Sequence, residues 1–208
     1  MPESYYTQDI TACFAGSIGA IGLDDDTYQH LLGSADEALA VIREHHKTGT
    51  LALLDLPAKT TDLENIEAIA ERYCEAFEDV VILGTGGSSL GGQSICEIAL
   101  AAGTSRPHLH FMANIDADSF DRLFQSITPE RTGFIVISKS GGTAETLTQF
   151  LYCLDIFRNQ LDEDKIKEHF TVITEPGDRA LRRLAKRWEL EIIDHDSRVG
   201  GRYSALSV

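Results

Sequence analysis

The sequence predicts an α/β protein: a three-layer αβα sandwich with a five-stranded parallel sheet, preceded by a helical N-terminal segment. The main observation is an alternation, over residues 61–208, of short apolar runs with longer amphipathic runs. Strands and helices alternate in this way when a parallel sheet is covered on both faces. The chain has 208 residues, of which 43% are hydrophobic, so it is long enough to bury such a sheet.

The N-terminal segment, residues 1–60, shows short helical stretches such as DEALAVIREHHK between turns that contain glycine. No residue pattern there indicates chemistry. A helix is predicted within residues 60–79, because Thr61 and Glu64 have the spacing of a capping box. Its apolar face is formed by Leu63, Ile66, Ile69, Tyr73 and Phe77. We therefore place a domain boundary between residues 60 and 61.

Beyond this helix, strands are predicted at residues 80–83, 109–112, 134–138, 170–174 and 190–194. Helices are predicted within residues 94–102, 116–127, 144–157 and 178–189. Because each strand but the last is followed by a helix, consecutive strands must run parallel.

The composition excludes several classes of protein. The 33 acidic and 18 basic residues give a formal charge of −15, which argues against binding nucleic acid or anionic lipid by electrostatics alone. An anionic ligand would need a local site. The N-terminus lacks the layout of a signal peptide, and no apolar run approaches the roughly 20 residues of a membrane span, so we expect a cytoplasmic protein. The four cysteines are widely spaced and predict reduced thiols.

A loop of glycine and serine, GTGGSSLGG at residues 84–92, follows the first strand. Gly84, Gly86 and Gly87 permit positive φ and close backbone approach, and Ser88 and Ser89 stand where the next helix should begin. Backbone N–H groups there could bind an anion. A tight turn with a helix cap explains the same residues, and neither a dinucleotide fingerprint nor a P-loop fits the spacing.

The second loop, SKSGGT at residues 138–143, follows the third strand and predicts a phosphate cradle. Ser138, Ser140 and Thr143 can each donate a hydroxyl proton, and Gly141 and Gly142 expose backbone amides between them. The alternative, a hydroxyl cap for the next helix, does not account for three hydroxyls and two glycines together.

Two charged residues accompany this loop. Lys139 could face an anionic ligand with its side chain, or contribute its backbone amide instead. Glu145 lies in the first turn of the next helix, where a carboxylate favours the helix dipole. We do not assign it as a catalytic base, because an anion beside a bound phosphate would weaken binding.

The C-terminal segment, DHDSRVGGRYSALSV, follows the fifth strand. Its first three residues, Asp-His-Asp at 194–196, do not predict a metal site, because consecutive extended residues point to opposite sides. Gly200 and Gly201 could turn the backbone so that Arg202 points into the crevice at the strand ends. A surface turn with an exposed arginine is the alternative.

Taken together, GTGGSSLGG, SKSGGTAET and VGGRYSALS, in this order and each after a strand, closely resemble the glucose-6-phosphate isomerase (phosphoglucose isomerase) family. The first two segments also resemble the broader sugar isomerase (SIS) fold, which is flavodoxin-like. The resemblance covers roughly residues 60–208. The lysine of the second loop and the GGRYS segment make it more specific than the general fold.

The resemblance implies an aldose–ketose isomerase that interconverts glucose 6-phosphate and fructose 6-phosphate, a step of glycolysis and gluconeogenesis, through a cis-enediol and without metal or cofactor. The second loop would surround the sugar phosphate through Ser138, Lys139, Ser140, Gly141, Gly142 and Thr143. Gly87 and Ser88 would touch the substrate, and Arg202 would stabilise negative charge at its reacting end.

The sequence departs from the family in its length. It stops at Val208, whereas family members carry a second sheet domain and, downstream, a catalytic glutamate, a ring-opening histidine and a late lysine. We therefore expect an N-terminal portion that lacks the catalytic base, and a homodimer in the full-length form. Thr85 also stands where isoleucine is usual. The alternatives are a non-catalytic SIS module that senses a sugar phosphate, and an isomerase of another sugar phosphate.

Overall fold

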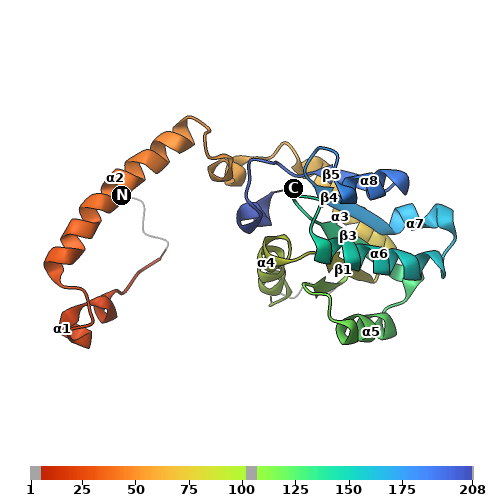
Figure 1. The fold of residues 1–208 in the computed structure, drawn as a ribbon, viewed down its shortest axis with the longest axis horizontal. Coiled ribbons are helices and arrows are strands. Elements are labelled where there is room, and N and C mark those ends of the chain that lie inside the picture. The colour runs from red at the N-terminus through yellow and green to blue at the C-terminus, as the bar shows by residue number, and fades with distance from the viewer. Residues whose placement is uncertain (1–5, 102–106, 208) are drawn as a thin grey trace. The chain divides into compact units, whose positions relative to one another are not determined.

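The computed structural model describes residues 6–101 and 107–207 (Figure 1). The chain divides into two compact units between Thr50 and Leu51. The first unit contains the 3-10 helix η1 (Thr11–Cys13) and the helices α1 (Ala15–Ile18) and α2 (Asp25–Lys47). Within it, the Phe14 and Tyr28 rings pack edge to face with centroids 5.0 Å apart.

Helix α2 is one continuous helix of 23 residues, so the prediction of short helical stretches with glycine turns is wrong here. Asp24 caps its start, because its carboxylate accepts a hydrogen bond of 2.8 Å from the Thr27 amide. Gly33 lies inside the helix. One interior glycine costs only about 1 kcal/mol relative to alanine, which the surrounding helix-forming residues outweigh.

The second unit is built on the predicted five-stranded parallel sheet, with strand order β2-β1-β3-β4-β5. The strands are β1 (Asp79–Leu83), β2 (His108–Met112), β3 (Thr132–Ile137), β4 (Phe170–Thr174) and β5 (Glu191–Asp194). This is the flavodoxin-like order, in which the connections reverse direction between β1 and β3. The two glycine loops follow these two neighbouring strands, so the topology brings both loops to the carboxyl edge of the sheet.

The helices of this unit are α3 (Leu63–Ala76), α4 (Leu90–Ala101), α5 (Ala117–Ser126), α6 (Ala144–Arg158), α7 (Glu163–His169) and α8 (Ala180–Arg187). Helix α7 was not predicted, because its seven residues are too short to show a period, although Ile166 and His169 are buried. Residues 1–5, Ala102 of the predicted helix 94–102, and Val208 lie outside the described residues.

The capping box predicted for α3 does not form. Asp62, not Thr61, occupies the N-cap position, and its side chain caps no helical amide in the described structure. Its carboxylate instead pairs with Lys59 Nζ at 2.6 Å. The apolar face of the helix is confirmed at Ile69 and Tyr73, which are buried, whereas Leu63 at the helix start is exposed.

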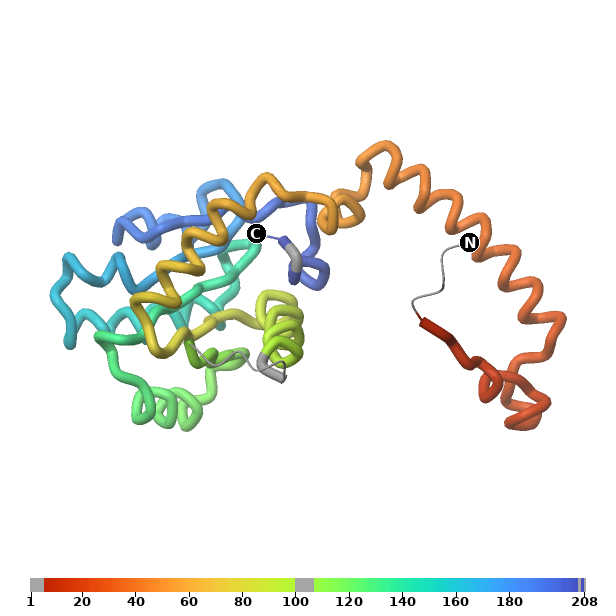
Figure 2. The backbone as a smooth tube through the Cα atoms, turned by 180° about the vertical axis from the view of Figure 1, so that it is seen from behind, coloured from red at the N-terminus to blue at the C-terminus, as the bar shows by residue number. Residues whose placement is uncertain are grey.

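The two faces of the sheet are covered differently. On one face, α5, α6, α7 and α8 enclose a core in which Phe134 stacks on Phe170 with centroids 4.6 Å apart. On the other face, α3 crosses the sheet (Figure 2) and packs Ile69 and Tyr73 against Val80. An apolar cavity of about 340 Å³ remains between α3, α4 and the strands. In the described parts of the chain, each helix is too short or too polar to span a bilayer.

Candidate functional site

The second loop, residues 138–143, leaves β3 and enters α6 at Ala144. The Ser138 amide still donates to the Ile173 carbonyl at 3.1 Å, which extends the pairing of β3 with β4 by one bond. The hydroxyl oxygens of Ser138 and Thr143 lie 3.0 Å apart across the loop. The Gly142 amide donates to Ser140 Oγ at 3.3 Å. The loop therefore closes on its own hydroxyls directly before the start of α6.

Gly141 is needed for the conformation of this loop, because its φ is +61°. A β-carbon there would also lie 2.9 Å from Arg179 Cβ and 3.0 Å from Thr174 Oγ1. The segment after β4 supports the loop from this side. The Leu181 amide donates to the Gly141 carbonyl at 2.9 Å, and Glu175 N donates to the Lys139 carbonyl at 3.0 Å. The second loop is thus fixed by its neighbouring strand connection.

The first loop contains the short 3-10 helix η4 (Gly86–Ser88), after which α4 begins. Gly87 packs against the backbone of the C-terminal segment. A β-carbon on Gly87 would lie 2.3 Å from the Gly201 carbonyl oxygen and 2.7 Å from Arg202 N. Only glycine permits this approach. Ser204 Oγ, which donates to the Gly201 carbonyl at 2.6 Å, lies 3.4 Å from the Gly87 carbonyl oxygen.

The C-terminal segment forms the 3-10 helix η6 (Gly201–Leu206) beside η4. Its backbone brings Arg202 next to the first loop, while the Arg202 side chain is exposed. The structure thus places the predicted arginine at the same edge of the sheet as both glycine loops. The role of its guanidinium remains a prediction.

A cavity of about 190 Å³ lies where the first loop, the second loop and the C-terminal segment meet. Each segment contributes to its wall, which includes Gly87, Ser88, Lys139, His195, Ser204 and Ser207. The predicted residues Gly87, Ser88 and Lys139 are therefore brought together. The predicted hydroxyls of Ser138, Ser140 and Thr143 lie outside this wall, in the loop itself.

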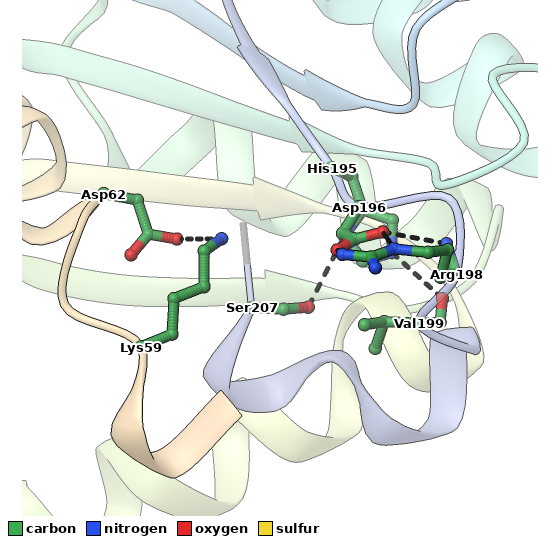
Figure 3. A network of polar contacts seen from close by, with 7 residues as sticks. All are labelled: Lys59, Asp62, His195, Asp196, Arg198, Val199 and Ser207. Carbon is green, nitrogen blue, oxygen red and sulfur yellow. Dashed lines mark hydrogen bonds and ion pairs between the residues drawn. The ribbon is translucent and has the colours of Figure 1, made fainter. Parts of the chain in front are cut away.

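His195 was not predicted to belong to the site, yet it lines this cavity and is only 4% exposed. Its Nε2 lies 3.3 Å from the Val199 carbonyl oxygen, and its Nδ1 lies 3.5 Å from Ser207 Oγ (Figure 3). Burial lowers the pKa of His195, and the positive charge of Lys139 lowers it further, against the opposing hydrogen bond to Val199. Its place directly after the fifth strand is the sequence signal that could have revealed it.

The next residue, Asp196, makes a separate ion pair. Its carboxylate accepts hydrogen bonds from the Arg198 guanidinium, at 2.7 Å, and from the Arg198 amide, at 2.9 Å. These bonds lower the pKa of Asp196 to about 2. In the described parts of the chain, no three His, Cys, Asp or Glu side chains are placed to hold a metal ion.

The strand order and the loops at the carboxyl edge define an SIS-type α/β protein. The fold is similar to that of tagatose-6-phosphate ketose/aldose isomerase from Escherichia coli, with a TM-score of 0.50 at 13% identity over 74% of this chain and 41% of that one. The sequence identifies a particular family within this fold. Residues 66–208 match the Phosphoglucose isomerase family, and the chain belongs to that family.

Similar proteins agree with this assignment. The chain is 32% identical to a glucose-6-phosphate isomerase from Carboxydothermus hydrogenoformans, over 88% of this chain and 41% of the relative. It is 35% identical to a glucose-6-phosphate isomerase from Thermus thermophilus, over 76% of this chain and 37% of the relative. A solved glucose-6-phosphate isomerase from Chlamydia trachomatis has a TM-score of 0.65 at 23% identity, over 89% of this chain and 41% of that one. The chain thus spans about two fifths of the length of these relatives.

Proposed function

We propose that the chain forms the sugar-phosphate-binding part of an aldose–ketose isomerase that interconverts glucose 6-phosphate and fructose 6-phosphate. The observation that carries this proposal is the meeting of the first loop, the second loop and the C-terminal segment around one cavity at the carboxyl edge of the sheet. In this family member, the substrate phosphate would occupy the second loop and the sugar would extend toward Gly87 and Arg202.

The second loop suits a phosphate dianion in a strongly acidic protein. Hydrogen bonds to charged groups are stronger than neutral ones, and the hydroxyls of Ser138 and Thr143 already converge within 3.0 Å. Helix α6 starts directly after the loop, so its dipole adds positive potential. These local donors offset the unfavourable net charge of −15.

Isomerisation through a cis-enediol needs a general base at the substrate carbon and a group that assists ring opening. Arg202 would stabilise the negative charge of the enediolate. The described wall of the cavity contains no carboxylate, and the family member from Carboxydothermus hydrogenoformans is matched over only 41% of its length. We therefore propose that this chain binds the sugar phosphate by itself but turns it over slowly or not at all. A homodimeric, cytoplasmic full-length enzyme belongs to the same proposal.

The proposal is tested by calorimetric titration of the chain with fructose 6-phosphate, with fructose as the ligand that lacks phosphate. Saturable binding of fructose 6-phosphate, together with no binding of fructose, is expected. A coupled assay for glucose 6-phosphate formation should show little or no turnover. Equal binding of both sugars would contradict a phosphate cradle in the second loop, and turnover at an ordinary enzymatic rate would contradict the absence of a base.

A further inference from the structure

His195 is a buried titratable residue that the proposed isomerisation does not use. It stands at the carboxyl end of β5, where its amide donates to the Thr174 carbonyl at 3.1 Å. The side chain is 4% exposed and turns toward the segment that follows in the chain. A buried imidazole at this position needs partners for both ring nitrogens, because an unmatched polar atom in a protein interior is costly.

The Val199 carbonyl fixes the tautomer of the ring. The Val199 carbonyl, 3.3 Å from Nε2, can only accept a hydrogen bond, so Nε2 must carry the proton. Nδ1 is then an acceptor, and it faces Ser207 Oγ at 3.5 Å. The ring therefore reaches both ends of the turn that contains η6 (Figure 3).

The start of this turn is also held from its other side. Val199 is fully buried and packs with Ala52 and Leu56 in a small separate core. Two residues later, the Gly201 carbonyl approaches Gly87 so closely that no β-carbon would fit. Val199 thus anchors the turn two residues before the Gly201 backbone meets the first loop.

We propose that His195, in its Nε2–H tautomer, is a positioning residue: it holds the 199–207 turn so that the Gly201–Arg202 backbone is docked against Gly87. The docking follows from the contacts of this chain alone, while its consequence for sugar recognition rests on the proposed function. His195 would act through the turn and not as a proton-transfer group, because its Nε2 proton is engaged by a backbone carbonyl.

The structure offers a matched control. His169 is also buried, at 6% exposed, and its Nδ1 lies 2.8 Å from the Thr132 carbonyl oxygen. It therefore bonds a backbone carbonyl as His195 does, but at the amino end of β3, the opposite edge of the sheet from the site. Replacing either ring removes a buried hydrogen bond, and only the loss of His195 should affect the turn.

The first test is hydrogen exchange measured by mass spectrometry on His195→Leu, His195→Gln and His169→Leu. His195→Leu should speed exchange at least about fivefold in peptides that cover residues 84–92 and 197–207, the size expected for one lost hydrogen bond. His195→Gln, which keeps an amide donor on a chain of similar reach, should restore most of the protection. His169→Leu should leave both peptides unchanged. Equal exchange in His195→Leu and the unmodified chain would overturn the proposal.

If His195→Leu does not fold, the tautomer of His195 can still be tested in the unmodified chain. Histidine-selective ¹⁵N NMR should show the proton of His195 on Nε2, and a proton on Nδ1 would overturn the proposal.

Ligand binding then distinguishes the positioning role of His195 from the proposed function of the chain. His195→Gln should keep the affinity for fructose 6-phosphate within about threefold, while His195→Leu should lower it about fivefold to tenfold and leave the affinity for inorganic phosphate unchanged. If the unmodified chain binds no sugar phosphate, the proposed function fails, and the exchange and NMR results still test His195.

Discussion

The first and second loops have similar sequences but are held in different ways. The second loop makes contacts within itself, such as the pair Ser138 and Thr143, which are five residues apart, and the connection after β4 also holds it through the bond from the Leu181 amide to the Gly141 carbonyl. The first loop is held by a segment far along the chain, since Ser204 contacts the Gly87 carbonyl across 117 residues. Of these two similar glycine and serine patterns, one closes on its own hydroxyls and the other receives the backbone of the chain's own C-terminal segment.

One glycine from each loop shows a further contrast. Gly141 is needed for its backbone conformation, with φ at +61°. Gly87 has no such φ and is needed because the Gly201 carbonyl lies where its β-carbon would be. Gly141 provides conformational freedom as well as space, whereas Gly87 provides space alone, and sequence patterns do not distinguish the two cases.

The largest effect is expected from removing the hydroxyls of the second loop with Ser138→Ala and Thr143→Ala together. Hydrogen bonds to a charged group contribute about 1.5–3 kcal/mol each, so affinity for fructose 6-phosphate should fall at least about 100-fold by calorimetry. The free energy of unfolding should change little, because the two hydroxyls are each other's partners and both are removed.

The matched control for this double variant is Ser126→Ala with Thr148→Ala. Those hydroxyls donate to carbonyls of their own helices, Leu123 and Ala144. Affinity should stay unchanged in the control. An equal loss of affinity in both double variants would show that the second loop is not the phosphate site.

Gly87→Ala should have the next largest effect and tests the docking of the C-terminal segment. The new methyl group would lie 2.3 Å from the Gly201 carbonyl oxygen, and backbone cannot rotate out of the way. Overpacking of this kind costs about 1–3 kcal/mol in free energy of unfolding, measured by urea denaturation. Gly92→Ala is the control for stability, because a β-carbon there meets only Phe111 at 3.9 Å. Equal stability of Gly87→Ala and the unmodified chain would remove the contrast between the loops.

Gly141→Ala should cost about 1–2 kcal/mol through the strain of alanine at positive φ, and its β-carbon would also lie 2.9 Å from Arg179 Cβ, which is bonded directly to the backbone. Urea denaturation gives the value. Gly142→Ala is the comparison, since its β-carbon would find nothing closer than the Ser140 carbonyl oxygen at 4.0 Å. If both substitutions cost the same, conformation is not what fixes glycine at residue 141.

The smallest effect is a dependence of stability on pH through His195. Burial, with the charge of Lys139, lowers the folded pKa of His195 below its ordinary 6.5, while Val199, Asp196 and Glu175 oppose the shift. The unfolded chain then binds the proton first as pH falls. Stability should be full above about pH 6.5, decrease below it, and level off once pH is below the folded pKa.

Urea denaturation at several pH values between 5 and 8, compared with His195→Gln, isolates this contribution. Asp196 does not interfere, because its pKa is held near 2, and its own contribution is lost only as pH falls from 3.8 toward that value. A steeper loss of stability in His195→Gln than in the unmodified chain would contradict the assignment.

Much of the fold could be predicted from the sequence because its signals are local. The apolar runs that became β1 to β5, and the amphipathic runs between most of them, depend on neighbours along the chain. Local rules failed at three places. Helix α3 begins one residue later than the capping box at Thr61 requires, with Asp62 as its N-cap residue, and the Asp62 carboxylate pairs with Lys59. The seven residues of α7 make too few helical turns to show a hydrophobic period in the sequence. Helix α2 continues through Gly33 because one glycine is a weak helix breaker.

The parallel α/β sheet and the family could be predicted from the sequence, because they depend on residue type and short spacing, whereas the phosphate-binding role of the SKSGGT loop stays a prediction. The three-dimensional fold was needed to show which residues share the cavity, that His195 is one of them, and that Gly87 must be glycine to receive the Gly201 backbone. The physical reason is sequence separation. These contacts join residues brought together by the order of strands in the sheet, and no local pattern records how closely two distant backbones approach.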